Sequence, residues 1–175
     1  MRTLTVAMLQ KAGACGDQVA TFRRLFGEGG TVTLARCRRA VAAGLDLHWA
    51  GDHLLTGTAL GQFDRATAPL RAECRQATGA ACAEFYATLD AVSAEYKKIF
   101  LVAQDQYAQK PSQAAWSKFR RTYEAAWAKL TKTMEAAWAK RMEVEDTARA
   151  KSNQGAAIAF YEAWNEQRLA LTLTK

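Results

Sequence analysis

The chain contains few residues that break helices and none of the short motifs that mark common enzyme classes. Its 175 residues include only two prolines and two histidines. It has no glycine-rich phosphate loop, no nucleophile elbow and no H-E-x-x-H zinc motif. The sequence therefore predicts a protein that is not an enzyme, with no catalytic residue, no cofactor and no metal site.

Long apolar runs are also missing. No stretch of eighteen apolar residues occurs, so no transmembrane helix is expected. The first fifteen residues are interrupted by Gln10 and Lys11 and make a poor signal peptide. We therefore expect a cytoplasmic protein without a membrane partner.

Cysteine and histidine are too sparsely placed to indicate a metal site. His48 and His53 stand five residues apart, whereas a helical zinc pair usually stands four apart. None of the cysteines forms a C-x-x-C pair, and we expect them to be small buried residues rather than a disulfide framework. They are Cys15, Cys37, Cys74 and Cys82.

A repeat of eleven residues is the strongest positive signal in the chain. Trp116, Trp127 and Trp138 are spaced by eleven, which is three helical turns and about 16.5 Å along a helix. An earlier stripe keeps the same period through Phe63, Cys74, Phe85, Tyr96 and Tyr107. The sequence therefore predicts two long helices, each with an aromatic stripe along one face.

Residues that usually end helices divide the chain and define the predicted architecture. Lys110-Pro111-Ser112 predicts a turn near 110–112, because the residue before a proline avoids helical geometry. Gly155 predicts a second turn near 152–155, followed by a last helix over 156–171. We expect an all-α protein in which residues 1–57 form a head of short helices and residues 58–175 form an elongated antiparallel bundle.

Within the head, four short helices are expected, each with a capping residue or a carboxylate at its start. Thr3, Asp17, Thr33 and Asp46 would open helices over 4–11, 17–26, 34–43 and 47–55. The segment 31–34 reads TVTL, and a short strand is an alternative there. A DNA-binding helix-turn-helix over 17–43 is a second alternative, although its turn would be long for that motif.

The tryptophan row allows two interpretations. Alanines stand beside each tryptophan, as in closely packed helices, and we expect the row to be buried against Phe85, Tyr96 and Tyr107. The alternative is an exposed row that binds a partner or stacks bases.

The net charge of +7 raises the question of nucleic acid, because a nucleic-acid binder usually gathers its basic residues on one face. Four lysines share the eleven-residue period and would form one basic track, and arginines lie in the head. The candidate contacts with a partner or with nucleic acid are Arg36, Arg39, Lys118, Lys129, Lys140 and Lys151. A solvated helix face is the plainer interpretation of the lysines.

Acid–base chemistry has one weak candidate. Asp46, His48, Asp52 and His53 cluster in the fourth predicted helix, and His48 and Asp52 are spaced for a hydrogen bond on one helix face. A capping aspartate and two surface histidines explain the same residues, so no catalytic role is assigned to them.

The head and the eleven-residue repeats together resemble a known group. The string MLQKAGAC over 8–15, then Asp17-Gln18-Val19, Phe26-Gly27 and later Trp49-Ala50, resembles the N-terminal module of bacteriophage and prophage proteins that continue into Ala-rich eleven-residue repeats. The resemblance covers nearly the whole chain and implies a phage or mobile-element origin. It implies no enzyme and no cofactor.

These observations together predict an interaction protein. The expected partner is a protein, or a protein–nucleic acid complex, of the host or the phage, and inhibition of a defence system such as CRISPR interference is one hypothesis. A basic nucleic-acid-binding protein and a structural or scaffolding virion protein are the alternatives. Self-association through the long helices is a further expectation for the partners.

Overall fold

The computed structural model describes residues 3–173, and the side chains as far as Gln167. It confirms the all-α fold class: short N-terminal helices precede two long antiparallel helices, and the only strands in this range form a two-stranded sheet of three residues each. In chain order the elements are β1 (Thr3–Thr5), α1 (Val6–Lys11), α2 (Gly16–Phe26), β2 (Gly29–Thr31), α3 (Leu34–Ala42), α4 (Leu47–Leu54), α5 (Gly57–Gln109) and α6 (Gln113–Leu173).

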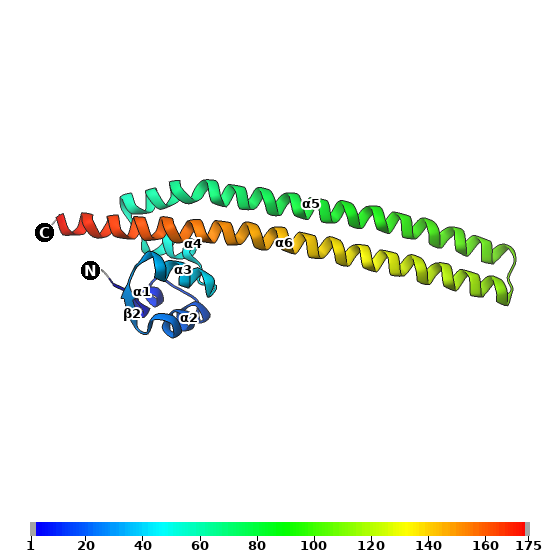
Figure 1. Cartoon of the computed structure of the whole chain (residues 1–175), viewed down its shortest axis with the longest axis horizontal. Helices are drawn as coiled ribbons and strands as arrows, with labels where there is room; N and C mark the ends of the chain where they lie inside the picture. The colour runs from blue at the N-terminus through cyan, green and yellow to red at the C-terminus, as the bar shows by residue number, and fades with distance from the viewer. Residues whose placement is uncertain (1–2, 174–175) are drawn as a thin grey trace. The chain divides into compact units, whose positions relative to one another are not determined.

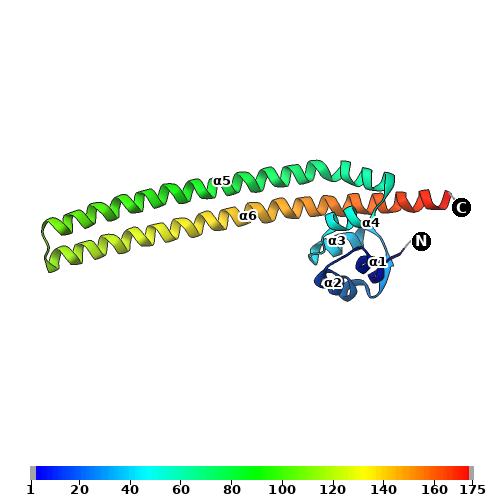
Figure 2. The ribbon, with the colours of Figure 1, turned by 180° about the vertical axis from the view of Figure 1, so that it is seen from behind.

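The described chain divides into two compact units. One contains residues 3–75 and 148–173, and the other contains residues 76–147. We call the first the head unit and the second the hairpin unit. In the hairpin unit α5 and α6 run side by side in opposite directions (Figures 1 and 2). None of the described helices is long and apolar enough to span a membrane.

The predicted turn near 110–112 is confirmed. Helix α5 ends at Gln109, and α6 begins at Gln113 after the Pro111 turn. The hydroxyl of Ser112 accepts a hydrogen bond from the backbone N–H of Ala115 at 3.1 Å, so it caps the first turn of α6.

The predicted turn near 152–155 is wrong, because α6 runs through this segment without a break. Gly155 provides room instead of a helix end: a Cβ atom there would lie 2.2 Å from the Cδ1 atom of Leu70. The glycine therefore allows α5 and α6 to approach closely. The expected last helix over 156–171 is the end of α6, and the bundle has two long helices rather than three.

The first helix begins later than predicted. Thr3 lies in β1, which pairs antiparallel with β2 so that Thr3 is opposite Thr31. Thr5 is the N-cap of α1, and its hydroxyl accepts from the N–H of Met8 at 3.3 Å. Capping by Thr33 and by Asp46 is confirmed.

The position of β2 tests two alternatives from the sequence, a strand over 31–34 and a helix-turn-helix over 17–43. Of the segment 31–34 only Thr31 is in a strand, and Leu34 opens α3. Because β2 lies between α2 and α3, the tight turn of a helix-turn-helix is absent.

The core of the head unit is built where α4, the first turns of α5 and the last part of α6 meet. Phe63, Phe160 and Trp164 are almost completely buried there. The Phe63 and Phe160 rings meet edge to face with centroids 6.5 Å apart, and Trp164 lies 5.7 Å from Phe160. The short helices are thus held by both long ones within this unit.

The expectation that the cysteines are buried is correct for one of the four. Cys37 is buried in the head core, and burial raises the pKa of its thiol to about 11, so it stays protonated and behaves as an apolar side chain. Cys15 is exposed, and Cys74 and Cys82 are half-buried; all four are free thiols.

Candidate functional site

The seam between α5 and α6 in the hairpin unit is narrow. Its buried apolar residues are mostly small or β-branched, which lets the two helices approach closely. They are Ala81, Val92 and Ala103 on α5, and Ala126 and Leu130 on α6. Larger side chains are placed at the two margins of this seam.

Aromatic pairs line one margin. Trp138 meets Phe85 with ring centroids 5.7 Å apart, Trp127 meets Tyr96 at 5.8 Å, and Trp116 meets Tyr107 at 5.5 Å. The three contacts predicted from the eleven-residue period are thereby confirmed. We call these six residues the aromatic edge.

Ion pairs line the other margin. Lys129 donates to Glu95 at 2.7 Å, and Lys140 donates to Glu84. In the head unit the same spacing recurs, where Lys151 donates to Glu73. We call the first two pairs the ionic edge of the hairpin unit.

Sequence reasoning found the lysine period but missed its partners. Glu73, Glu84 and Glu95 are spaced by the same eleven residues, so the signal was available in the sequence. One further step along both helices would pair Lys118 with Gln106, which carries no charge. Of the four predicted lysine contacts, three are therefore neutralised by a carboxylate, and among the described residues no ion pair is found for Lys118.

The two edges lie on opposite sides of the seam. Trp127 and Lys129 are two residues apart, which is about 200° around a helix. Both nevertheless reach α5, through Tyr96 and Glu95. They must therefore reach it from opposite sides, so the hairpin unit has one aromatic and one charged margin.

The tryptophans are not core residues, and the prediction that they are buried is wrong. Trp116, Trp127 and Trp138 are 48%, 51% and 50% exposed. A seam between only two helices buries one narrow stripe, and no third helix covers its margin in the described chain. Each indole therefore packs on its aromatic partner of α5 and remains about half in solvent, and on α6 Phe119 also contacts Trp116 while Arg141 lies over Trp138.

Truncation of Trp127 to alanine is accordingly expected to cost less than truncation of a core tryptophan. About half of the usual 3–5 kcal/mol, or roughly 2 kcal/mol, should be lost from the free energy of unfolding. Urea denaturation measures this loss. Strong acrylamide quenching of the wild-type tryptophan fluorescence is the companion result, and weak quenching would contradict the exposure described above.

The predicted arginine contacts lie together in the head unit. The guanidinium groups of Arg36 and Arg39 lie 5.7 and 5.9 Å from the centroid of the Phe26 ring, within reach of a cation–π interaction. Arg36 also donates to the carbonyl of Thr31 at 3.2 Å. Both side chains remain accessible to solvent, and their positions are set by Phe26.

The acid–base cluster is organised by a residue that the sequence did not single out. Arg71 on α5 donates from Nε to His48 Nδ1 at 3.1 Å and from its terminal nitrogen to Asp52 at 2.8 Å. His48 Nε2 lies 3.0 Å from the hydroxyl of Ser152. Asp46 caps α4, as expected, and no direct bond joins His48 to Asp52.

This arrangement resembles a serine–histidine pair, but its polarity is reversed. Because Arg71 is always protonated, His48 Nδ1 must accept, and the ring proton is on Nε2. His48 then donates to Ser152 and cannot take its proton as a general base. Ser152 is also only 6% exposed. The cluster joins α4 to α5 and α6, and it supplies no activated nucleophile.

A pH dependence of stability follows from the same contacts. Burial first, and then the charge of Arg71, lower the pKa of His48 below its ordinary 6.5, against weaker opposite effects of Asp46 and Asp52. Below pH 6.5 the unfolded chain binds a proton at His48 before the folded chain does. The stabilisation is therefore complete above pH 6.5 and is lost as the pH falls from there through the folded-state pKa.

Melting temperatures measured between pH 8 and pH 5 test this expectation. The wild type should lose stability across the acidic half of that range, and His48→Gln should flatten this part of the profile. His53→Gln, at an exposed position of the same helix, is the control for the substitution itself. Parallel profiles for the wild type and His48→Gln would refute the role of His48.

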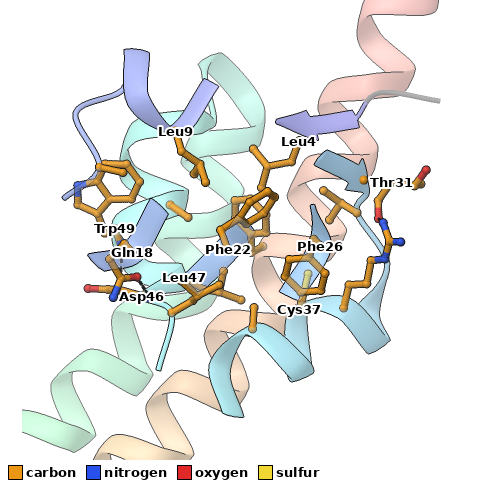
Figure 3. Close-up of a pocket in the computed structure, with 18 residues that line it drawn as sticks. Leu4, Leu9, Gln18, Phe22, Phe26, Thr31, Cys37, Asp46, Leu47 and Trp49 are labelled. Carbon is orange, nitrogen blue, oxygen red and sulfur yellow. Dashed lines mark hydrogen bonds between the residues drawn. The ribbon is translucent and has the colours of Figure 1, made fainter. Parts of the chain in front are cut away.

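A small apolar hollow of about 60 Å³ lies within the head unit. Leu4, Phe22, Phe26 and Leu47 point into it, and Gln18 and Asp46 meet at its margin (Figure 3). Its lining offers apolar contacts and no converging set of charged groups. It has room for a small apolar group and carries no chemistry of its own.

No group of three or more metal-ligating side chains occurs among the residues that the structure describes. Comparison with protein families, with curated proteins and with solved structures finds no match to the chain. The aromatic edge is therefore the candidate functional site, on its geometry alone.

Proposed function

We propose that this is a non-enzymatic interaction protein, encoded by a bacteriophage or prophage, which binds a macromolecular complex of the host or the phage. The half-exposed row of Trp116, Trp127 and Trp138 is the observation that carries the proposal. Tryptophan is enriched at the energetic centres of protein interfaces, and three in one row are a costly surface to leave in water. The link to a phage and to host defence rests on the resemblance of the head sequence.

The charges favour a protein partner over nucleic acid. Phosphate binding needs cations that are available to neutralise the backbone. Lys129, Lys140 and Lys151 each have a glutamate partner instead. The positive charge of the lysine track is therefore balanced by glutamates along most of its length. The apolar surface of the aromatic edge, in contrast, remains exposed to solvent.

Affinity capture from a host lysate tests the proposal. The wild-type protein should retain a stoichiometric partner, and a variant with all three tryptophans of the aromatic edge changed to alanine should lose it. The matched control changes Leu101 and Val102 to alanine, because these apolar residues are similarly exposed but belong to no aromatic pair. Equal capture by the tryptophan variant and the wild type would refute the proposal.

The same assay distinguishes the nucleic-acid alternative. A partner held through phosphates should be released steeply as the salt concentration rises, and it should be lost when Lys129 and Lys140 are changed to glutamate. A partner held by the aromatic edge should resist salt and survive those two changes. A partner that is released by salt, but is captured equally by the wild type and the tryptophan variant, would overturn the proposal in favour of nucleic-acid binding.

A further inference from the structure

We infer that the aromatic edge is occupied by a second copy of this chain, with the two α6 helices packed antiparallel and Trp127 at the two-fold axis. The inference rests on the proposed function, in which this edge is a protein-binding surface. It identifies a second copy of the chain as one protein that binds there. A second copy and any other protein partner would compete for this one edge, so the dimer must open before the other partner binds.

The even spacing of the row fits a partner identical to itself. Trp116 and Trp138 stand eleven residues on either side of Trp127, so the row is the same in both directions along the helix. A two-fold axis at Trp127 places Trp116 opposite Trp138 of the second copy, and the reverse. An isologous interface requires this kind of self-complementary surface.

The charges beside the row favour the antiparallel arrangement. Arg120 lies seven residues before Trp127 and Glu135 lies eight residues after it, and both are exposed. Arg120 is four residues after Trp116, and Glu135 is three before Trp138, so both flank the row. An antiparallel copy brings Arg120 opposite Glu135, whereas a parallel copy in register would oppose like charges.

Arg120 can leave its present ion-pair partner to bind Glu135 of a second copy. Arg120 meets Glu124 at 3.6 Å on the same helix, and both side chains are largely in solvent. Such a surface pair contributes little to stability. Moving Arg120 to Glu135 of a second copy therefore costs little and adds one ion pair on each side of the axis.

The surface area that the aromatic edge can bury sets the expected affinity of the dimer. A tryptophan side chain buries about 150–250 Å², so three half-exposed ones on each copy supply roughly 600 Å² in total. Stable interfaces bury about 1,200 Å² or more. The flanks, including Met134 and Arg120, must supply the rest, so we expect a reversible dimer with a dissociation constant in the micromolar range.

Sedimentation equilibrium of the full chain between about 1 and 200 µM tests the inference. The wild type should pass from monomer to dimer over this range. Trp127→Glu should remain monomeric throughout, with its helical content checked by circular dichroism. Leu101→Glu, at an exposed apolar position outside the edge, should dimerise like the wild type.

Charge reversal tests the orientation without touching the tryptophans. Arg120→Glu alone and Glu135→Arg alone should each weaken the dimer by about tenfold, and the double variant should restore it. Loss without rescue in the double variant would overturn the antiparallel register. Dimerisation of Trp127→Glu at wild-type strength would overturn the surface itself.

The outcome also separates this inference from the proposed function. A wild type that is monomeric at 200 µM, but still captures a lysate partner through its tryptophans, would overturn the second copy and leave the interaction surface standing. A monomer whose tryptophan variant behaves like the wild type in capture would overturn both.

Discussion

Replacement of Phe63 by alanine should lower the free energy of unfolding by about 3–5 kcal/mol, as for other fully buried aromatic residues. Phe63 has no exposed surface, and its ring meets Phe160 and His48 edge to face. The guanidinium of Arg71 lies 5.8 Å from the ring centroid as well. The substitution therefore removes the residue on which α4 and both long helices converge.

Urea denaturation followed by circular dichroism measures this effect. Tyr86→Ala is the control, because Tyr86 is 54% exposed and its truncation should cost less than half as much. A loss below that of Tyr86→Ala would show that the head unit does not depend on Phe63.

Introduction of a methyl group at Gly51 should be the second most damaging change. A Cβ atom at Gly51 would lie 2.1 Å from Cε1 of Phe63, well inside van der Waals contact. Phe63 is completely buried and has no space to withdraw, so Gly51→Ala forces the core to shift. Overpacking of this kind typically costs about 1–3 kcal/mol, and we expect the upper end of that range or more.

Gly79 offers a matched control in the middle of α5. Nothing lies within 4 Å of a Cβ atom built there, so Gly79→Ala should stabilise the chain by about 0.5–1 kcal/mol through helix propensity. Combining Gly51→Ala with Phe63→Leu should recover part of the stability lost at Gly51, because the smaller side chain opens space. Equal effects of the two glycine substitutions would refute the steric explanation.

The sequence predicts the long helices well because their signals are local. The eleven-residue period identifies the partners Phe85, Tyr96 and Tyr107 correctly, and Pro111 marks the turn between the helices. Both signals depend only on helical geometry and on the conformational limits of proline. The capping residues Thr33 and Asp46 were predictable for the same reason.

The errors arise where the meaning of a residue depends on its tertiary neighbours. Gly155 looks like a helix stop, but it is a contact point for Leu70, and no local pattern separates these roles. Burial of the tryptophans depends on how many helices surround them, which spacing does not specify. The position of Arg71 between His48 and Asp52 joins segments far apart in the chain, so only the fold brings it to light.

The constant register of the hairpin unit also has a consequence for how such a chain can change its length in evolution. Each step of eleven residues on α6 faces a step of eleven on α5, with an aromatic contact at three steps and an ion pair at two of them. A duplication of one step in only one helix would shift every later pair out of line. A paired insertion, one in each helix on either side of the Pro111 turn, would extend the hairpin by about 16.5 Å and keep every existing contact.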